Sequence, residues 1–291
     1  MDNVIEIKGL SKSYKNRNVL NSLSLSVPKG AVYGLLGRNG SGKTTLIKTV
    51  LGLLKYSSGS LSVLSDNPWA FRDVTKERLG YVPQSDRLYP WLTVGQLIDY
   101  TASFYAHWNH ELIARLVREW RVDLKDKVGL LSEGQAQKVS IILSLGHEPE
   151  LLVFDEPVAS LDPAARRQFL KTIVEIVSAR PCTIFFSTHI TSDLERVADH
   201  VAILIDGGIA FSGGLDDLKD EVKRLRIFAK KKFPPDFTLD GAIHCEHSDH
   251  EVIASVRNFH PELKKRLEDS WDAEVHIENL NLEEIFLELS R

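Results

Sequence analysis

The chain has 291 residues, of which 43% are hydrophobic and 26% are charged. This is ordinary globular composition, and the length predicts one large domain or one domain with a small appendage. The formal net charge of −4 argues against binding to nucleic acid or anionic lipid through a basic surface. Cys182 and Cys245 stand in no paired spacing, so we expect free thiols in a reduced, cytosolic protein.

The sequence gives no sign of a membrane segment of its own. Its first residues lack the positive and apolar regions of a signal peptide. No run of about 18 apolar residues could span a bilayer. The longest apolar stretches, such as residues 201–205, have the length of strands. We therefore expect this protein to serve a membrane only through a partner.

Short apolar runs alternate with longer helical patterns over the first part of the chain, as in an α/β domain with a largely parallel sheet. We expect strands at residues 4–7, 23–27, 31–36 and 79–82. The helical spacing of apolar residues predicts helices at residues 44–54, from 93 to about 121, and after Ser132. Near-continuous apolar runs predict strands buried on both faces at residues 151–154, 183–186 and 201–205.

The character of the chain changes after residue 215. Gly207-Gly208 signals a hairpin turn before a short strand at 209–211, and residues 218–225 are typical of a charged helix. A Lys-Lys-Lys-Phe-Pro-Pro segment then breaks the pattern, and the remainder indicates a small α+β domain. We therefore expect a first domain at 1–220 and an accessory domain at 221–291.

A phosphate-binding loop follows the third expected strand. Residues 37–44 fit G-x-x-x-x-G-K-[ST] in full. The glycines let backbone N–H groups curl toward phosphate oxygens, and the helix N-terminus adds its positive dipole end. Lys43 can supply a charge to the β- and γ-phosphates, and the Thr44 hydroxyl can ligate Mg²⁺. The predicted nucleotide-binding residues here are Gly37, Arg38, Asn39, Gly40, Ser41, Gly42, Lys43, Thr44 and Thr45. On this loop alone, a kinase, a GTPase and a DNA motor stay open.

A second candidate feature is a buried strand that ends in two adjacent acids, Asp155 and Glu156. Open parallel sheets place their chemistry at this end of a strand. Asp155 fits a residue that holds Mg²⁺ directly or through water, and Glu156 could orient and deprotonate an attacking water. The alternative is a solvated acidic turn, and the intact phosphate-binding loop upstream argues against it.

The segment Leu131-Ser132-Glu133-Gly134-Gln135 lies shortly before that strand. Here the sequence resembles the ABC ATPases, whose signature reads Leu-Ser-Gly-Gly-Gln. Ser132 is expected to cap a helix, and Gly134 lets the backbone approach a phosphate. The resemblance implies that Ser132 to Gln135 complete the γ-phosphate site of the opposite subunit in a head-to-tail dimer. Glu133 replaces the family's first glycine, and we expect its carboxylate to point away from phosphate.

Four further positions match the family pattern in order. Tyr14 resembles the aromatic residue that stacks on adenine. Gln84 resembles the glutamine that touches Mg²⁺ and the attacking water and links to the transporter. Asp162, which ends a Ser-Leu-Asp segment, resembles the loop that crosses the dimer interface, and His189 resembles the switch histidine that contacts the γ-phosphate. Taken singly, Tyr14 and His189 are explained by packing, so it is the joint order that supports their roles.

The resemblance implies a P-loop NTPase fold with a mostly parallel core sheet. An antiparallel β subdomain would precede it, a helical subdomain would span about residues 88–145, and a small α+β appendage would follow. ATP is the implied substrate and Mg²⁺ the implied cofactor. The implied catalytic residues are Glu156, His189 and Gln84, and the implied Mg²⁺ ligands are Thr44, Gln84 and Asp155.

Residues 281–289 resemble the ending of ATPase subunits in the exporter branch that handles antibiotics, lipids and peptides. The resemblance implies a separate transmembrane permease as partner, a homodimer or heterodimer with another ABC ATPase, and a place at the inner face of the cell membrane. The large apolar residues at 88–92 would anchor the permease, or belong to the core.

Two other functions stay open. A soluble ABC ATPase that acts on ribosomes or DNA usually carries tandem ATPase domains, a long coiled-coil insertion or zinc modules. None of these is evident here, so we expect no nucleic-acid partner. A regulatory ATPase that binds a permease without pumping is the other alternative.

Residues 244–250 are rich in histidine, cysteine and acidic residues, a composition that is found in zinc sites. No second ligand pair lies at a known spacing, and structural zinc sites usually draw two pairs from two elements. We therefore expect a polar surface loop rather than a metal site.

Overall fold

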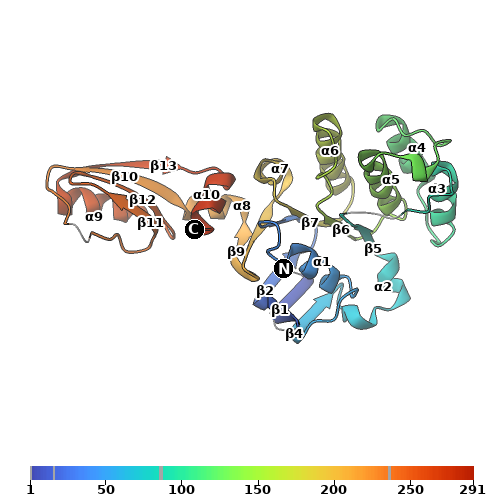
Figure 1. Cartoon of the computed structure of the whole chain (residues 1–291), viewed down its shortest axis with the longest axis horizontal. Helices are drawn as coiled ribbons and strands as arrows, with labels where there is room; N and C mark the ends of the chain where they lie inside the picture. The colour runs from blue at the N-terminus through green and yellow to red at the C-terminus, as the bar shows by residue number, and fades with distance from the viewer. Residues whose placement is uncertain (1, 16, 85–87, 235–236) are drawn as a thin grey trace. The chain divides into compact units, whose positions relative to one another are not determined.

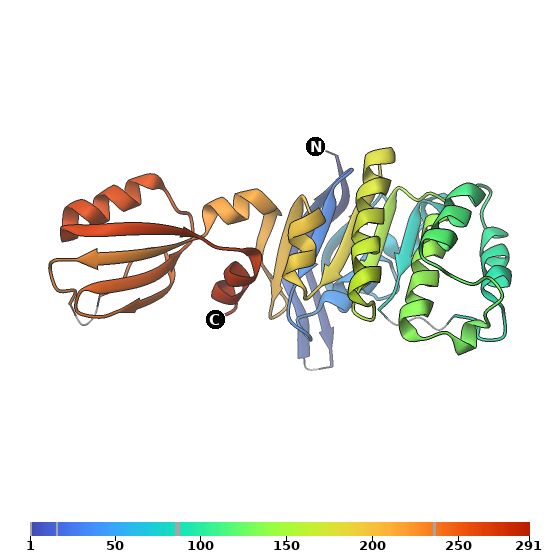
Figure 2. The same cartoon turned by 90° about the horizontal axis from the view of Figure 1, so that it is seen from above.

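The computed structural model describes residues 2–15, 17–84, 88–234 and 237–291. The chain forms two compact units, Met1–Ser212 and Gly213–Arg291, which are drawn from two sides in Figures 1 and 2. In the part of the chain that the structure describes, no helix combines the length and apolar character needed to cross a membrane.

The first unit contains two sheets. A three-stranded antiparallel sheet has the order β2-β1-β4 and consists of β1 (Asn3–Tyr14), β2 (Arg17–Pro28) and β4 (Ser58–Val63). A six-stranded sheet has the order β5-β6-β7-β3-β8-β9 and parallel pairing from β5 through β8. Its strands are β3 (Val32–Leu36), β5 (Leu79–Val82), β6 (Leu151–Asp155), β7 (Thr183–Thr188), β8 (His200–Ile205) and β9 (Gly208–Gly214). This confirms the expected antiparallel subdomain and parallel core.

Helices cover both faces of the six-stranded sheet, which explains its near-continuous burial. Helix α1 (Lys43–Val50) contacts β2 and β4 as well as β6, so it lies between the two sheets. Ile5, Leu46 and Val153 belong to the core that these three layers share. Helices α6 (Pro163–Ala179) and α7 (Thr191–Val197) lie on the opposite side of the sheet (Figure 1).

A helical segment extends from the β5 end of the sheet (Figures 1 and 2). Thr93 and Ser132 begin two of its helices with capping boxes, in which the side chain of each cap and a glutamine three residues later bond each other's backbone N–H groups. The helices of this segment are α3 (Val94–Ala102), α4 (His110–Glu119), the short 3₁₀ turn η2 (Val128–Leu130) and α5 (Glu133–Leu145). Two small elements, η1 (Pro68–Ala70) and α2 (Asp73–Glu77), precede β5.

The second unit is an antiparallel sheet of order β11-β12-β10-β13 with its own core. Ile227, Val252 and Val275 on one face of this sheet pack in the same cluster as Leu267 of helix α9. The elements are α8 (Leu215–Glu221), β10 (Lys223–Ala229), β11 (Ala242–His247), β12 (Glu251–Val256), α9 (Pro261–Trp271), β13 (Ala273–Asn279) and α10 (Leu282–Leu289).

The structure corrects three of the expected elements. The expected helix from 93 to about 121 is two helices, because the Asn109 side chain accepts a hydrogen bond from Leu112 N and caps a new helix. The expected helix at 44–54 ends earlier, at Val50. The expected helix at 218–225 ends at Glu221, and β10 begins at Lys223 because Leu225 and Ile227 follow the two-residue period of a strand.

Candidate functional site

The phosphate-binding loop lies where the sequence predicts, between the end of β3 and α1. Gly40 and Gly42 have φ angles of +82° and +112°, which residues with a side chain rarely adopt. A Cβ on Gly37 would lie 2.8 Å from Leu204 O, so the loop is seated against β8. Gly42 precedes α1 without a side-chain cap. The first N–H groups of α1 are thus left for another acceptor, as an anion site requires.

The carboxyl ends of β3, β6 and β7 meet at one edge of the sheet, because β7 pairs with both β3 and β6. This juxtaposition brings the loop after β3 beside Asp155 and Glu156 at the end of β6. Lys43 Nζ donates to Gly37 O at 2.8 Å and lies 3.0 Å from Glu156 Oε1. Both side chains of this ion pair are buried.

Glu156 is the centre of a three-residue contact. Its Oε2 lies 2.9 Å from His189 Nδ1, at the position just beyond β7. The His189 side chain is 45% exposed, whereas Glu156 is 5% exposed. The backbone of Glu156 has a φ of +50°, which is uncommon for a residue with a side chain. The structure therefore brings two predicted site residues, Lys43 and His189, into contact with the carboxylate of a third, Glu156.

Asp155 is held by a residue that the sequence analysis did not single out. Ser187 Oγ donates to Asp155 Oδ1 at 2.8 Å and accepts a hydrogen bond from Glu156 N at 2.9 Å. A buried hydroxyl two positions before His189 on an apolar strand is the sequence signal that could have indicated Ser187.

Two predicted residues are not joined to this cluster by a hydrogen bond or ion pair among the described residues. Tyr14 lies at the end of β1, half-exposed, with Lys12 Nζ 4.9 Å from its ring centroid. Gln84 follows β5 and is exposed, where it lines a groove on the helical segment. Their expected roles toward adenine and Mg²⁺ stay predictions.

The signature segment begins α5, and Ser132 caps it as the sequence predicts. Ser132 Oγ accepts from Gln135 N at 3.3 Å, and Gln135 Oε1 accepts from Ser132 N at 2.9 Å. Gly134 has a structural role that the sequence did not indicate, because a Cβ there would lie 2.9 Å from Ser160 O. Residues 132–135, including Glu133, line one small hollow together with residues 160–162. The direction expected for the Glu133 carboxylate stays a prediction.

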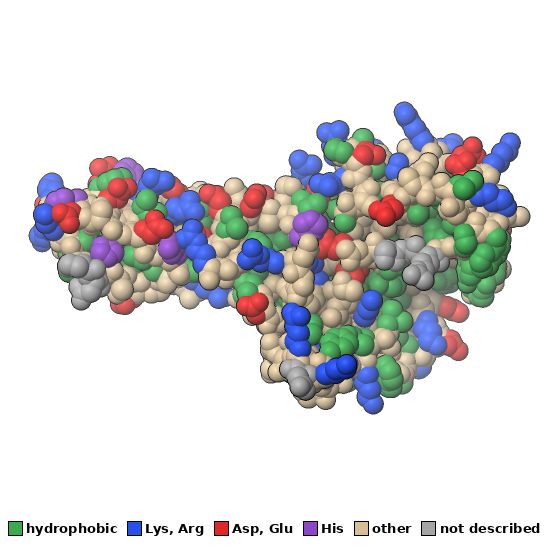
Figure 3. Space-filling model, viewed as in Figure 1, with side chains coloured by type: hydrophobic (Ala, Val, Ile, Leu, Met, Phe, Trp, Pro, Cys, Tyr) green, Lys and Arg blue, Asp and Glu red, His purple; other side chains and the backbone are tan. Residues whose placement is uncertain are grey.

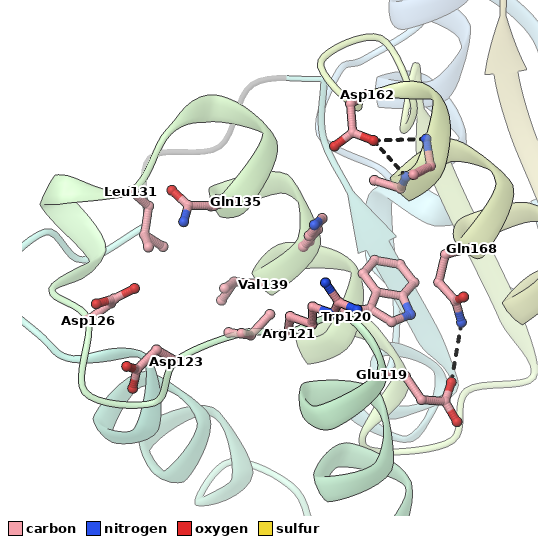
Figure 4. Close-up of a pocket in the computed structure, with 14 residues that line it drawn as sticks. Glu119, Trp120, Arg121, Asp123, Asp126, Leu131, Gln135, Val139, Asp162 and Gln168 are labelled. Atoms are coloured by element: carbon pink, nitrogen blue, oxygen red, sulfur yellow. Dashed lines mark hydrogen bonds between the residues drawn. The ribbon is translucent and has the colours of Figure 1, made fainter.

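Asp162 caps helix α6, a role that is independent of any dimer. Its Oδ1 accepts from Ala164 N at 2.8 Å and Ala165 N at 2.9 Å, and these bonds hold the pKa of the Asp162 carboxyl below its usual range. Figure 4 displays this cap at the rim of a hollow of about 450 Å³ behind the signature helix. At the edge of the same hollow, Gln168 Nε2 donates to Glu119 Oε2 at 3.3 Å and links α6 to α4.

A larger groove of about 1110 Å³ lies on the helical segment. Tyr89 and Trp91 line it, and Trp91 is 66% exposed, so these two aromatics are not core residues. Tyr89 also stacks edge-on against Tyr100, which in turn contacts Phe104 with ring centroids 5.0 Å apart. Figure 3 shows hydrophobic side chains gathered over this end of the molecule. We call Tyr89, Trp91, Tyr100 and Phe104 the aromatic patch.

The site fits a bound nucleotide by its donor chemistry. The glycine cradle and the buried Lys43 suit phosphate oxygens, and Ser41 Oγ is buried with no hydrogen-bond partner among the described residues. A hydroxyl from Thr44 and a carboxylate from Asp155 are the oxygen ligands that Mg²⁺ prefers. Elsewhere, the residues with assigned positions contain no group of three or more His, Cys, Asp or Glu that could hold a metal ion.

The polar surface loop expected at residues 244–250 is partly a strand, because residues 244–247 belong to β11. Strand β11 alternates its residues between faces, so Cys245 packs against the core while His244 Nε2 pairs with Glu246 Oε1 at 2.8 Å. His250 Nδ1 lies 3.1 Å from Ala229 O.

The ABC transporter family profile matches residues 20–159, and a second profile, described as AAA domain, putative AbiEii toxin, Type IV TA system, matches residues 127–192. The uncharacterized ABC transporter ATP-binding protein YdbJ of Bacillus subtilis is 33% identical over 270 residues, covering 91% of this chain and 87% of the relative. The chain belongs to the ABC transporter ATP-binding proteins. It is the ATPase subunit of an ABC transporter, and it binds and hydrolyses ATP.

Two further comparisons agree with this assignment. The bacitracin transport ATP-binding protein BcrA of Bacillus licheniformis is 32% identical over 230 residues, covering 78% of this ABC ATPase and 75% of the relative. A solved ATP-binding subunit of an ABC transporter superposes with a TM-score of 0.68 at 31% identity, covering 75% of this chain and 92% of that one. ATP-binding proteins of this family dimerise and work with transmembrane permeases.

Proposed function

We propose that Mg²⁺-ATP bound between two subunits of this ABC ATPase closes the dimer, that closure drives a separate export permease, and that hydrolysis reopens the dimer. The observation that carries the proposal is the contact of Glu156 with both Lys43 and His189 beside the phosphate-binding loop. Similarity to a bacitracin transport ATP-binding protein supports a role in transport, and the export direction rests on the resemblance of residues 281–289 to exporter subunits.

The buried ion pair supports an ordered sequence of events. Lys43 Nζ holds Glu156 Oε1, and an arriving phosphate competes for the same ammonium group. Once Lys43 binds the β- and γ-phosphates, Oε1 of Glu156 is released to accept a hydrogen bond from water. Thr44 and Asp155, with Gln84, would hold Mg²⁺, which when bound would supply charge stabilisation at the phosphates.

Hydrolysis then needs a base and a group that senses the γ-phosphate. Glu156 takes a proton from water as the water oxygen bonds to the γ-phosphorus and the bond to ADP breaks. His189 would be within reach of the γ-phosphate, because its side chain is half-exposed and already contacts Glu156. Tyr14 would stack on the adenine.

We propose two subunits because the family resemblance implies that Ser132 and Gly134 contact the γ-phosphate of an ATP held by the phosphate-binding loop of the opposite subunit. The cap of α5 uses the backbone N–H of Gln135, and the N–H groups before it would form a second anion site, where a second copy or a related subunit would place its γ-phosphate. Asp162 would lie at the same interface.

The aromatic patch is the proposed permease contact. Exposed Trp91 and Tyr89 at the edge of a groove are the large, rigid anchors that interfaces favour. Through this contact the ATPase would sit at the inner face of the cell membrane. The accessory domain at 221–291 is not needed for any step above.

The change Glu156→Gln tests the proposal. Hydrolysis should fall by about 10²- to 10⁴-fold, the usual contribution of a general base, and ATP should trap a dimer that size-exclusion chromatography resolves. Glu150→Gln is the matched control, because Glu150 pairs with Arg78 and its pKa is lowered by that partner. Near wild-type hydrolysis by Glu156→Gln, with no ATP-dependent dimer, would refute the mechanism. Recovery of a permease with the chain from membranes tests the partner.

A further inference from the structure

Ser187 lies at the centre of the edge where the candidate site is assembled. Strand β7 runs between β3 and β6, and Ser187 pairs in register with Leu35 on one side and Asp155 on the other. Its side chain is completely buried, with 0% exposure. A hydroxyl in such a place must have its hydrogen-bonding capacity met within the protein.

The direction of both hydrogen bonds at Ser187 is fixed by chemistry. The backbone N–H of Glu156 can only donate, so Ser187 Oγ accepts there, at 2.9 Å. The single hydroxyl hydrogen is then directed to Asp155 Oδ1, at 2.8 Å. One side chain therefore holds the carboxylate of Asp155 and the backbone of Glu156 at the same time.

Each bond restricts a different degree of freedom. The bond to Oδ1 fixes the rotation of the Asp155 carboxylate, so that Oδ2 is the oxygen left to face a cation or its bound water. The bond to Glu156 N supports a residue whose φ of +50° is unfavourable on its own. The Glu156 side chain is thereby directed to Lys43 and His189.

The other hydroxyls of this strand do something different. Thr183 Oγ1 accepts from Gly30 N at 2.8 Å, and Thr188 Oγ1 accepts from Ile190 N at 3.0 Å. Both of those bonds end on backbone outside the acidic pair. Within the described part of β7, Ser187 is the hydroxyl that contacts Asp155.

We propose that Ser187 is a positioning residue for ATP hydrolysis, which orients Asp155 toward Mg²⁺ and keeps Glu156 aimed at the attacking water. This rests on the proposed function, in which Asp155 holds Mg²⁺. Residues that orient a metal ligand typically contribute 10- to 100-fold to metal affinity or activity.

The experiment compares ATP affinity with Mg²⁺ and with EDTA in the full chain, for wild type and Ser187→Ala. The gain in affinity that Mg²⁺ provides should shrink by about 10-fold or more, while affinity in EDTA stays within about twofold. The Mg²⁺ concentration for half-maximal hydrolysis should rise in parallel. Ser187→Cys keeps the shape of the side chain with only a weak donor and acceptor, so it should show the same loss even if the alanine variant folds poorly.

Thr183→Val is the matched control, since it removes a buried hydroxyl bond from the other end of the same strand. It should leave the Mg²⁺ dependence unchanged. The role of Ser187 would be overturned if its variants lost ATP affinity equally with Mg²⁺ and with EDTA. It would also be overturned if Mg²⁺ raised the ATP affinity of both variants as much as that of the wild type. If Asp155→Asn loses the Mg²⁺ dependence while both Ser187 variants keep it, the positioning role fails and the proposed function stands. If wild type itself shows no Mg²⁺ dependence, the proposed function fails.

Discussion

Removal of the Glu156 charge should make the phosphate-binding loop a better anion site. Lys43 Nζ is 3.0 Å from Glu156 Oε1, and both groups are buried. Opposite charges about 4 Å apart attract by about 4 kcal/mol at the effective dielectric of protein sites. Glu156→Gln removes the negative charge from this contact, and an interaction of this kind with a charged group is worth about 1.5–3 kcal/mol net of desolvation. In the variant, a phosphate group no longer competes with the Glu156 carboxylate for Lys43. The affinity of the loop for phosphate should therefore rise by about 10- to 100-fold.

The assay is calorimetric titration with ADP in EDTA. ADP lacks the γ-phosphate that a second subunit would bind, so a tighter complex cannot arise from dimer trapping. Glu150→Gln should bind ADP as the wild type does, because Glu150 pairs with Arg78 at 2.8 Å. Equal or weaker binding of ADP by Glu156→Gln would show that the ion pair does not restrain Lys43.

Three further outcomes are expected. Trp91→Ala should reduce recovery of the permease with the chain while the ATPase rate of the chain alone is unchanged. Burial holds the pKa of His147 below its ordinary value of 6.5. As the pH falls, His147 is protonated at a higher pH in the unfolded chain than in the folded protein. The free energy of unfolding should therefore decrease as the pH drops below about 6.5. His147→Phe should flatten the dependence of the melting temperature on pH between 7 and 5. Gly34→Ala should destabilise the fold by about 1–3 kcal/mol in denaturant unfolding, because the new Cβ would lie 2.0 Å from Leu194 Cδ2.

The sequence predicts those parts of the site that are contiguous in the chain. The loop from Gly37 to Thr44 and the pair Asp155-Glu156 each combine a strand end with the residues that act there. Their positions at the carboxyl ends of β3 and β6 follow from that context. The α/β class follows from the same alternation of apolar runs and helical patterns.

Contacts between strands were not predictable in the same way. Ser187 meets Asp155 only because β7 pairs with β6 in one particular register, and a shift of one residue would turn its hydroxyl to the other face. The break between α3 and α4 was missed because apolar spacing continues through it, although Asn109 provides a cap. The early start of β10 was missed because a charged helix and a half-exposed strand share many residue types.

Gly134 and Ser160 are in contact so close that a single added carbon would not fit. The start of α5 therefore packs directly against the segment that runs from Glu156 into α6, and neither can move toward the other without displacing it. In a dimer of the proposed kind, α5 responds to the nucleotide held by the partner, whereas Glu156 acts on the nucleotide held by its own loop. A short packing contact of this sort would let the two ATP sites influence each other through a few residues of one chain.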